Sequence, residues 1–422
     1  MRLLLLFLSI FVTGASAADD VLLVNATVIP APGQPALPHT AVLIREGRIA
    51  DVGPREQMKV PAGTEIVDCS GKFITAGFWN CHVHLIAPDL LRAREVPVAQ
   101  LDGTLEAMFT RWGFTTVFDL ASSLENTVAL RERIETGEVR GPRILTTGEP
   151  IWTRVPIYVP PDLVANNAGM SPVATAAEAV QRIDEHARKG ADGIKLFTGS
   201  MQAQGAVANM DLALVRAAVA EADRLHLPVF AHPQNADGVE AAVAGGVDIL
   251  AHTAPNAPAW TPEYASRLHD AGVALIPTLT LFRIEGQRAQ LPPAILEKWR
   301  ANALAQVRVF HAAGGEFLFG TDIGYITYYD TAEEYQLLAS TGLDAAAILR
   351  SLTTAPAARF GRRTALTFPL FPPPQKKRSW PSDSRPDTCT NTLRHCCAAC
   401  TCSSPNRRRW SRCHRAYAST TR

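Results

Sequence analysis

The chain has 422 residues, of which 47% are hydrophobic and 19% are charged, and its formal net charge is +1. This composition indicates a folded protein with a large apolar core. The near-zero net charge excludes a protein that binds nucleic acid through overall positive charge, because the one basic block lies in the C-terminal segment.

The first 17 residues have the pattern of a secretory signal peptide. Arg2 precedes the apolar residues 3–12, and Ala15-Ser16-Ala17 matches the small-residue cleavage pattern. The apolar run is shorter than the roughly 20 residues that cross a membrane. We therefore expect cleavage after Ala17, a periplasmic or secreted protein, and no membrane association after cleavage. An uncleaved anchor is the alternative.

Residues 18–75 predict a small β domain. Short apolar runs at residues 21–29, 41–52 and 64–68 are separated by Pro and Gly turns. Arg45-Glu-Gly-Arg48 has the pattern of a hairpin turn, in which Gly47 takes a positive φ. We expect a β-sandwich-like domain here.

Residues 76–361 alternate between short apolar runs and longer amphipathic stretches. The strand-like runs are residues 77–84, 113–119, 142–148, 192–198, 228–232, 247–252, 273–278 and 316–322. The amphipathic stretches include residues 175–189, 211–225, 261–271 and 294–313. Eight strands followed by helices predict an α/β fold of the (β/α)8 TIM-barrel type. In such barrels the active site lies at the carboxyl ends of the strands.

Residues 362–422 differ in composition from the rest of the chain. From residue 361 to the end there are 13 Lys and Arg and 2 Asp, a charge of +11, while the remainder holds 28 basic and 38 acidic residues, a balance of −10. Six of the eight cysteines also lie there. Three interpretations are open: a zinc-binding module using Cys397, Cys400, Cys413 and His414, a disulfide-bearing basic tail, or an out-of-frame translation of the true C-terminus. We favour the third, since the composition changes abruptly.

Four of the eleven histidines stand where predicted strands end, at His82, His84, His232 and His252, and Asp322 ends the eighth strand. Side chains alternate faces along a strand, so His82 and His84 point the same way while Val83 faces the outer helices. Imidazoles and a carboxylate gathered at one end of a barrel are typical of a metal site.

We interpret the other histidines of the barrel and one aspartate as structural residues. Helical stretches contain His186, His269 and His311, and His226 follows one, so we expect none of them in the site. Asp119 ends the second strand, and we expect it to cap or support the site, with direct contact as the alternative.

The segment Gly71-Lys-Phe-Ile-Thr-Ala-Gly-Phe-Trp-Asn-Cys-His-Val-His-Leu85 resembles the sequence that opens the barrel in metal-dependent amidohydrolases. The resemblance covers about residues 21–361 and continues through Gly190-Ala-Asp-Gly-Ile-Lys-Leu-Phe197, Val229-Phe-Ala-His232, Asp248-Ile-Leu-Ala-His252, Gly320-Thr-Asp322 and residues 352–361. Asn80 stands where the family usually has Asp. The family's closing Gly-x-Ala-Asp-Leu-type strand is missing, which leaves the small β domain incomplete.

The resemblance implies two divalent metal ions, which we expect to be Zn²⁺ because neutral imidazoles suit zinc. His82, His84 and Asp322 would hold one ion, and His232 and His252 the other. Lys195 would carry a CO2-derived carbamate that bridges both ions. A buried ion pair is the alternative for this lysine.

The resemblance also implies a mechanism. Two ions about 3.5–4 Å apart share a water that becomes hydroxide at neutral pH, and this metal-bound hydroxide attacks a carbonyl carbon. Asp322 is expected to be the catalytic residue, taking the proton of the water and passing it to the leaving nitrogen. We therefore predict an amidohydrolase that cleaves carbon–nitrogen bonds.

Substrate contacts are expected from three loops. Trp152 and Arg154 lie in residues 149–171, a candidate lid after the third strand, while Arg283 follows the seventh strand and Tyr325 the eighth. The Gly-Ile-Lys-Leu-Phe-Thr-Gly series is most similar to the imidazolonepropionase-related and dipeptide-cleaving branch. A dipeptide, an N-acyl amino acid or a cyclic amide is the favoured small-molecule substrate.

Two other functions are open. The same site could hydrolyse esters, lactones or phosphotriesters, or the chain could be a non-catalytic secreted barrel crippled by its C-terminus. No nucleic-acid partner is expected, and a homo-oligomer is compatible with the sequence.

Overall fold

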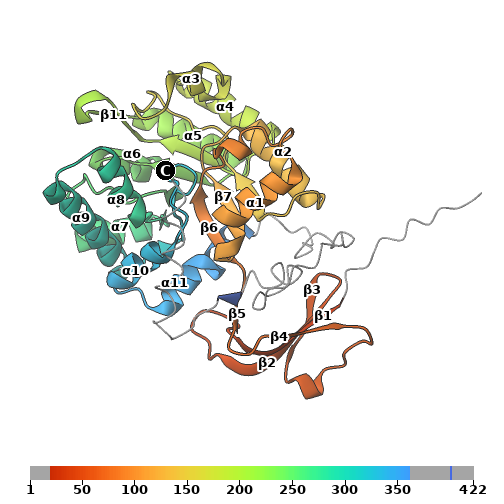
Figure 1. The fold of residues 1–422 in the computed structure, drawn as a ribbon. Coiled ribbons are helices and arrows are strands. Elements are labelled where there is room, and N and C mark those ends of the chain that lie inside the picture. The colour runs from red at the N-terminus through yellow and green to blue at the C-terminus, as the bar shows by residue number, and fades with distance from the viewer. Residues whose placement is uncertain (1–19, 362–399, 402–422) are drawn as a thin grey trace, which may run out of the picture.

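A computed structural model of the chain describes residues 20–361 and residues 400–401 (Figure 1). The signal-peptide prediction and most of the C-terminal tail, with the zinc and disulfide hypotheses about it, lie outside these described residues. Within the described residues, no helix has both the length and the apolar composition needed to cross a membrane.

The N-terminal strands form one six-stranded sheet. Its members are β1 (Val21–Val28), β2 (Leu37–Arg45), β3 (Arg48–Gly53), β4 (Glu65–Asp68), β5 (Phe73–Ile74) and β16 (Cys400–Thr401). The order is β16-β5-β1-β2-β3, and β4 also pairs with β1. Successive β1 residues pack on opposite faces, with Val21 and Leu23 in one apolar cluster and Leu22 in another. The described strands thus form a single sheet rather than the two facing sheets of the expected sandwich.

A short strand from the C-terminal segment completes one edge of this sheet. In antiparallel register, Cys400 pairs with Ile74 and Thr401 with Phe73. Figure 1 shows this strand beside β5. The sequence predicted that no strand returns to the small β domain, and the structure differs at these two residues.

Eight parallel strands make up the larger body of the protein. They are β6 (Phe78–Val83), β7 (Phe114–Asp119), β8 (Arg143–Thr146), β9 (Ile194–Phe197), β12 (Val229–His232), β13 (Ile249–Leu250), β14 (Ala274–Leu275) and β15 (Glu316–Phe317). Each of the eight predicted runs contains one of them. A hairpin of β10 (Gly199–Met201) and β11 (Val207–Asn209) follows β9.

The eight strands form two sheets, ordered β6-β7-β8 and β15-β14-β13-β12-β9. Backbone hydrogen bonds connect the sheets on both sides. The Cys81 N–H donates to the Phe319 carbonyl at 2.7 Å, and the Ile151 N–H donates to the Lys195 carbonyl at 2.8 Å. The result is a TIM-barrel-like α/β fold.

Helices follow the strands along the chain and surround them (Figure 1). They are α1 (Val98–Met108), α2 (Leu124–Glu135), α3 (Pro161–Ala165), α4 (Ala176–Arg188), α5 (Leu212–Arg224), α6 (Ala236–Gly245), α7 (Pro262–Asp270), α8 (Leu279–Arg288), α9 (Pro293–Ala312), α10 (Ala332–Ser340), α11 (Ala345–Leu352) and α12 (Thr354–Gly361). The four predicted helices correspond to α4, α5, α7 and α9. Three of them begin at polar caps, Thr175, Asp211 and Thr261, whose side chains accept a backbone N–H in the first turn.

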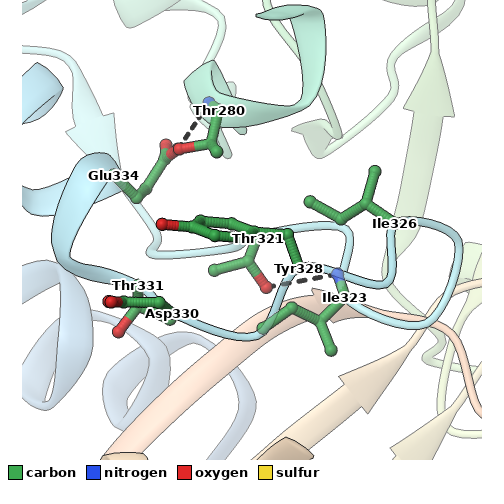
Figure 2. A pocket seen from close by; sticks show the side chains of 8 residues that line it. All are labelled: Thr280, Thr321, Ile323, Ile326, Tyr328, Asp330, Thr331 and Glu334. Carbon is green, nitrogen blue, oxygen red and sulfur yellow. Dashed lines mark hydrogen bonds between the residues drawn. The ribbon is translucent and has the colours of Figure 1, made fainter. Parts of the chain in front are cut away.

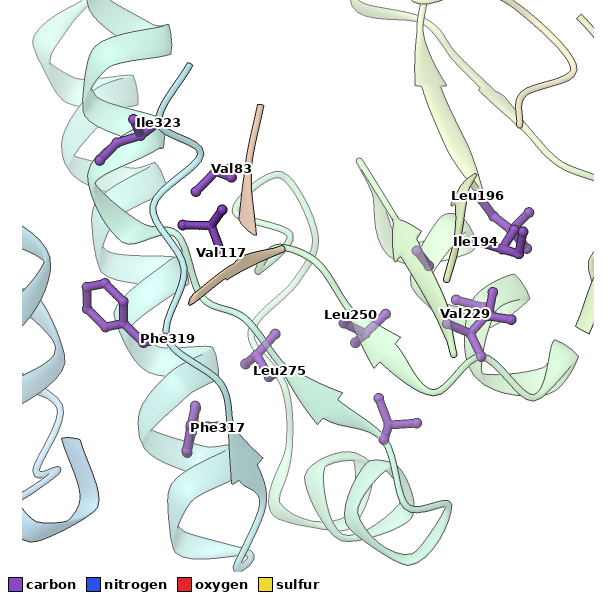
Figure 3. Close-up of a cluster of buried hydrophobic side chains, with 14 of the residues drawn as sticks. Val83, Val117, Ile194, Leu196, Val229, Leu250, Leu275, Phe317, Phe319 and Ile323 are labelled. Carbon is purple, nitrogen blue, oxygen red and sulfur yellow. The ribbon is translucent and has the colours of Figure 1, made fainter. Parts of the chain in front are cut away.

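Successive side chains of each strand point to opposite faces, and this alternation separates two apolar layers. Ile194 and Leu196 of β9 belong to the larger cluster, which includes buried residues of the helices. Figure 3 shows part of it, with Val83, Val117 and Ile323 gathered in one place. Val83 therefore packs in the outer layer, as its position between two histidines predicted. Side chains on the other strand faces form the inner cluster.

The inner cluster is built around stacked aromatic rings. Phe360 of α12 lies 6.0 Å from Trp79, 5.2 Å from Phe118 and 5.9 Å from Phe230, measured between ring centroids. Phe360 is only 5% exposed, so its ring fills space between the strands, while Thr354, Ala357 and Ala358 of the same helix are exposed.

We predict that Phe360→Ala lowers the free energy of unfolding by about 3–5 kcal/mol, because it removes a buried ring and leaves a cavity. Urea denaturation followed by circular dichroism measures this loss. Ile295→Ala, at a side chain 40% exposed on α9, is the control and should change stability by no more than about 0.5 kcal/mol. Equal effects of the two substitutions would contradict the packing role of Phe360.

Candidate metal centre

The four predicted histidines meet at the carboxyl ends of the parallel strands. Their ring centroids form a chain: His84 lies 5.3 Å from His82, His82 lies 4.5 Å from His252, and His252 lies 4.7 Å from His232. Asp322 joins them, with its Oδ1 atom 2.7 Å from His84 Nε2 and 3.5 Å from His82 Nε2. Side chains separated by up to 240 positions in sequence thus converge as the pattern of strand ends predicted.

His82 presents a lone pair to the centre. Its Nδ1 lies 2.8 Å from the Ala251 carbonyl oxygen, which can only accept, so Nδ1 carries the proton. Burial lowers the pKa of His82 well below its ordinary value, and the nearby Lys195 lowers it further. The Nε2 lone pair therefore faces Asp322 Oδ1. Within the described residues neither of these two buried atoms makes a hydrogen bond, although His84 Nε2 lies 2.7 Å from the Asp322 oxygen. Two buried acceptors this close repel each other unless a cation lies between them.

His252 is oriented by a threonine. The Thr278 hydroxyl donates to the Pro277 carbonyl at 2.9 Å, so it accepts from His252 Nδ1 at 2.7 Å. This bond fixes the proton on Nδ1 and leaves Nε2 as the free ligand atom. Burial lowers the pKa of His252 well below its ordinary value, which keeps the ring neutral.

His232 is oriented by a glutamine and a phenylalanine. Its Nε2 donates to Gln234 Oε1 at 3.0 Å, which leaves Nδ1 unprotonated, and its ring stacks on Phe197 at a centroid distance of 4.4 Å. Burial lowers the pKa of His232 to about 4, and Lys195 contributes to the same direction.

Lys195 lies in the middle of β9 and is 1% exposed. Its Nζ has no hydrogen-bond partner within the described residues. Burial lowers the pKa of its amine to about 7, and the carboxylate of Asp322 opposes this change. A fully buried amine without a hydrogen-bond acceptor does not fit the ordinary ion pair that was the alternative for this residue.

The atoms present fit a bound divalent cation. One ligand atom each from His82, His252 and Asp322 lies within 4.8 Å of the others, and all three side chains are buried. Neutral imidazole nitrogen and carboxylate oxygen are the ligands that zinc prefers. Sequence analysis assigned His82 and Asp322 to one ion and His252 to the other. In the structure, all three side chains lie close enough together to contact the same ion.

Three of the nine non-glycine residues with positive φ in the described part of the chain lie at the centre. Gln234, Thr278 and Asp322 have φ values of 57°, 47° and 64°, in the left-handed region that non-glycine residues rarely adopt. Each of these three either contacts a histidine of the centre or is itself a candidate ligand. Such conformations cost on the order of 1–3 kcal/mol each and are typical of functional sites.

Two polar residues hold the first and eighth strands in place. Asp119 is fully buried, and its Oδ1 accepts from the Leu85 N–H at 3.2 Å and from the Ser122 hydroxyl at 2.5 Å. Asn80 donates to the Thr321 hydroxyl at 2.7 Å, next to Asp322. Asp119 therefore supports the loop after His84, as expected, and Asn80 connects β6 to the strand that carries Asp322.

The residues predicted to contact substrate differ in their surroundings. Trp152 is buried against Phe197 and donates to the Met170 carbonyl at 2.8 Å, so it packs behind the His232 ring. Arg283 forms a salt bridge with Glu333, and its guanidinium is engaged at the surface. Arg154 is exposed. Tyr325 lies closest to the centre, 6.4 Å from the His84 ring.

Sequence reasoning did not assign Tyr158 to the site. Its hydroxyl lies 3.5 Å from His232 Nε2, and its ring lies 5.8 Å from that of Tyr325. Burial raises the pKa of Tyr158 well above its ordinary value, so the hydroxyl keeps its proton. The residue lies within the predicted lid, but no local pattern distinguishes it from the other aromatic residues there.

A family model matches most of the chain. Residues 73–365 match the model described as the amidohydrolase family. The chain belongs to the amidohydrolase family. This family is generally metal-dependent, in agreement with the buried triad of His82, His252 and Asp322.

Curated relatives match over short segments. An imidazolonepropionase of Acidiphilium cryptum (strain JF-5) is 42% identical over 55 residues, which cover 13% of this chain and 14% of the relative. An N-substituted formamide deformylase of Arthrobacter pascens is 35% identical over 95 residues, 21% of this chain and 17% of the relative. The matches thus span less than a fifth of the length of either relative.

Solved structures match over most of the chain. A Xaa-Pro dipeptidase with bound methionine has 20% identity and a TM-score of 0.67, covering 81% of this chain and 89% of that one. A prolidase complexed with n-methylphosphonate-L-proline has 25% identity and a TM-score of 0.65, covering 81% and 88%. At 20% and 25% sequence identity, these two matches show that the folds are similar.

We predict that Zn²⁺ raises the melting temperature of metal-free protein, because a ligand that binds only the folded state at about 100 times its Kd stabilises it by about 2.7 kcal/mol. His82→Ala should reduce both this rise and the metal bound per chain, measured by thermal denaturation and elemental analysis. His269→Ala, at an exposed position on α7, is the matched control and should change neither. Equal zinc responses in both variants would remove His82 from the metal site.

Proposed function

We propose that this member of the amidohydrolase family is a hydrolase that cleaves a carbon–nitrogen bond of a small substrate at two divalent metal ions, held in a closed (β/α)8 barrel. The observation that carries the proposal is a set of three buried polar atoms at the carboxyl ends of the strands that make no hydrogen bond within the described residues: His82 Nε2, Lys195 Nζ and Asp322 Oδ1. Buried polar atoms normally have partners, so three of them converging among four histidines favour a cation site.

Each proposed ligand has a role defined by its contacts. His82, His84 and Asp322 would hold one ion, and His232 and His252 would hold the second, with zinc as the expected metal. When bound, zinc would supply Lewis-acid polarisation of the substrate carbonyl and activation of a water molecule. The hydrogen bonds from His82 to Ala251, His252 to Thr278 and His232 to Gln234 keep one nitrogen of each ring deprotonated.

Asp322 is the proposed proton carrier. A carboxylate oxygen of Asp322 accepts the proton of the water whose oxygen bonds to the carbonyl carbon. The same carboxyl group then donates that proton to the leaving nitrogen as the C–N bond breaks. Tyr158 keeps its phenolic proton and is available to donate a hydrogen bond to the substrate beside His232.

Lys195 is the proposed site of a carbamate. The lone pair of its Nζ forms a bond to the carbon of CO2, and the nitrogen loses a proton. The product is an anion with two oxygen ligands. This modification would replace a buried neutral amine, which makes no hydrogen bond within the described residues, by an anion whose oxygens could bind cations beside Asp322.

A dipeptide, an N-acyl amino acid or a cyclic amide is the proposed substrate class. Relatives named as a formamide deformylase and a dipeptidase support a carbon–nitrogen bond as the target. Tyr158 and Tyr325 face each other beside the histidines and are the proposed substrate contacts. From the composition of residues 1–17, we propose a periplasmic or secreted location.

Hydrolysis of esters, lactones or phosphotriesters is the alternative, because the same activated water can attack these groups. A panel that compares dipeptides, N-acyl amino acids and cyclic amides with aryl esters separates the two. Higher kcat/KM for every ester than for every amide would replace the proposed activity by the alternative. No turnover of either class by the metal-loaded protein would favour the non-catalytic hypothesis.

We predict that Asp322→Asn lowers kcat by about 10²–10⁴-fold, because an amide cannot carry the proton. Bound metal should persist, since the remaining ligands are unchanged, and elemental analysis checks this. Asp330→Asn is the control, because Asn at that position can still accept the hydrogen bond from the Ala332 N–H. Wild-type turnover by Asp322→Asn would remove this residue from the mechanism.

We predict that isotope-labelled CO2 gives a carbamate carbon signal in the nuclear magnetic resonance spectrum of the metal-loaded protein. Lys195→Gln should lose this signal and bind less metal, because the amide cannot react with CO2. Lys189→Gln, which lies just after α4 and outside the site, should keep both. A carbamate signal that persists in Lys195→Gln would place the modification elsewhere.

A further inference from the structure

The helix that follows the seventh parallel strand has an unusual start. Helix α8 begins after Thr278, but the Thr278 side chain makes no capping hydrogen bond. Its hydroxyl is occupied instead, because it donates to the Pro277 carbonyl and accepts from His252 Nδ1. The first N–H groups of a helix need acceptors from elsewhere when the cap residue does not supply one.

Glu334 of α10 supplies those acceptors. Its Oε1 accepts the Leu279 N–H at 2.8 Å, and its Oε2 accepts the Thr280 N–H at 2.7 Å and the Thr280 hydroxyl at 2.8 Å. Figure 2 shows the carboxyl group of Glu334 directed at Thr280, and both residues line the same small cavity. A carboxylate at a helix N-terminus is also favoured by the helix dipole.

Burying the carboxylate of Glu334 costs free energy, because the charged group is removed from water. Glu334 is 1% exposed, and burial raises its pKa to about 7, with the hydrogen bonds from Thr280 and Leu279 opposing that rise. Arg283 of α8 already forms a salt bridge with Glu333 of α10 at the surface. A contact between the two helices therefore does not require the buried carboxylate of Glu334.

We propose that Glu334 is a positioning residue for the metal centre: by capping α8 in place of Thr278, it leaves the Thr278 hydroxyl free to orient His252. This inference rests on the proposed function, since it gives His252 the role of a metal ligand. Thr278 holds a left-handed conformation with φ of 47°, so its hydroxyl stays on His252 only while the start of α8 is fixed from outside. Glu334 and Thr321, which neighbours Asp322, both line the cavity of Figure 2.

The test is a zinc titration of metal-free, full-length protein against a competing chelator, with stepwise dissociation constants for wild type and variants. Glu334→Gln offers one acceptor oxygen where the carboxylate offers two, so one helix N–H loses its partner. We expect it to weaken one of the two binding steps by about 10–100-fold, the usual effect of losing an outer partner of a metal ligand. Glu333→Gln is the matched control on the same helix and should keep both wild-type constants.

A double-mutant cycle shows whether Glu334 acts through Thr278. Thr278→Val removes the hydroxyl from His252 and should weaken the same binding step. The double variant should then be no weaker than the more affected single variant, because both substitutions remove one function. Thr278→Ser retains the hydroxyl and should bind zinc nearly as wild type does.

Several outcomes would overturn the inference. Wild-type zinc affinity in folded Glu334→Gln would do so, and so would multiplicative losses in the double variant. If Glu334→Gln does not fold, Thr280→Val removes only one hydrogen bond to Glu334 and should give a smaller loss at the same step; unchanged affinity there would overturn the inference. Failure of wild type to bind zinc would instead overturn the proposed function and this inference with it.

Discussion

The metal centre depends on one constraint: the fold holds the lone pairs of buried nitrogen and oxygen atoms close together. His82 Nε2 faces Asp322 Oδ1 at 3.5 Å, and within the described residues neither atom makes a hydrogen bond, although His84 Nε2 lies 2.7 Å from the same oxygen. Burial holds His82 neutral, so the ring cannot relieve the repulsion by taking up a proton. The unpartnered Lys195 amine adds a second polar group without a hydrogen-bond acceptor to the same place. The strands bring these atoms together, and a bound cation would convert their repulsion into attraction.

The positions of the candidate ligands could be predicted because they follow from local regularities. Strand periodicity and turn residues locate all eight parallel strands, and the ends of those strands share one rim of the fold. His82 and His232 stand at such ends, so their convergence needs no knowledge of loops, whereas Asp322 lies five residues beyond the end of β15. Lys195 could be singled out for a similar reason, since a charged residue within an apolar strand requires a special environment.

The support around the ligands could not be predicted from the sequence. Tyr158 reaches His232 from a loop 74 positions away, and Glu334 reaches Thr280 from a helix 54 positions away. These contacts depend on how loops and helices pack, and no spacing rule encodes that packing. The closeness of His252 to His82 and Asp322 likewise depends on the packing of strands that are distant in the sequence, and the division of the ligands between two ions stays a prediction.

Strain and support are coupled in this fold. The inner and outer apolar clusters fix the strands. Just beyond the strand ends, Gln234 and Thr278 adopt left-handed backbone conformations, which are unfavourable for non-glycine residues. Such conformations persist only where neighbouring contacts determine them. The Gln234 side chain forms a hydrogen bond with His232, and the Thr278 hydroxyl forms one with His252. The strained backbone at Gln234 and Thr278 therefore places the groups that orient the two imidazole rings. A buried carboxylate at the start of α8 is consistent with this arrangement, because an unsupported helix end would let Thr278 relax into an ordinary cap.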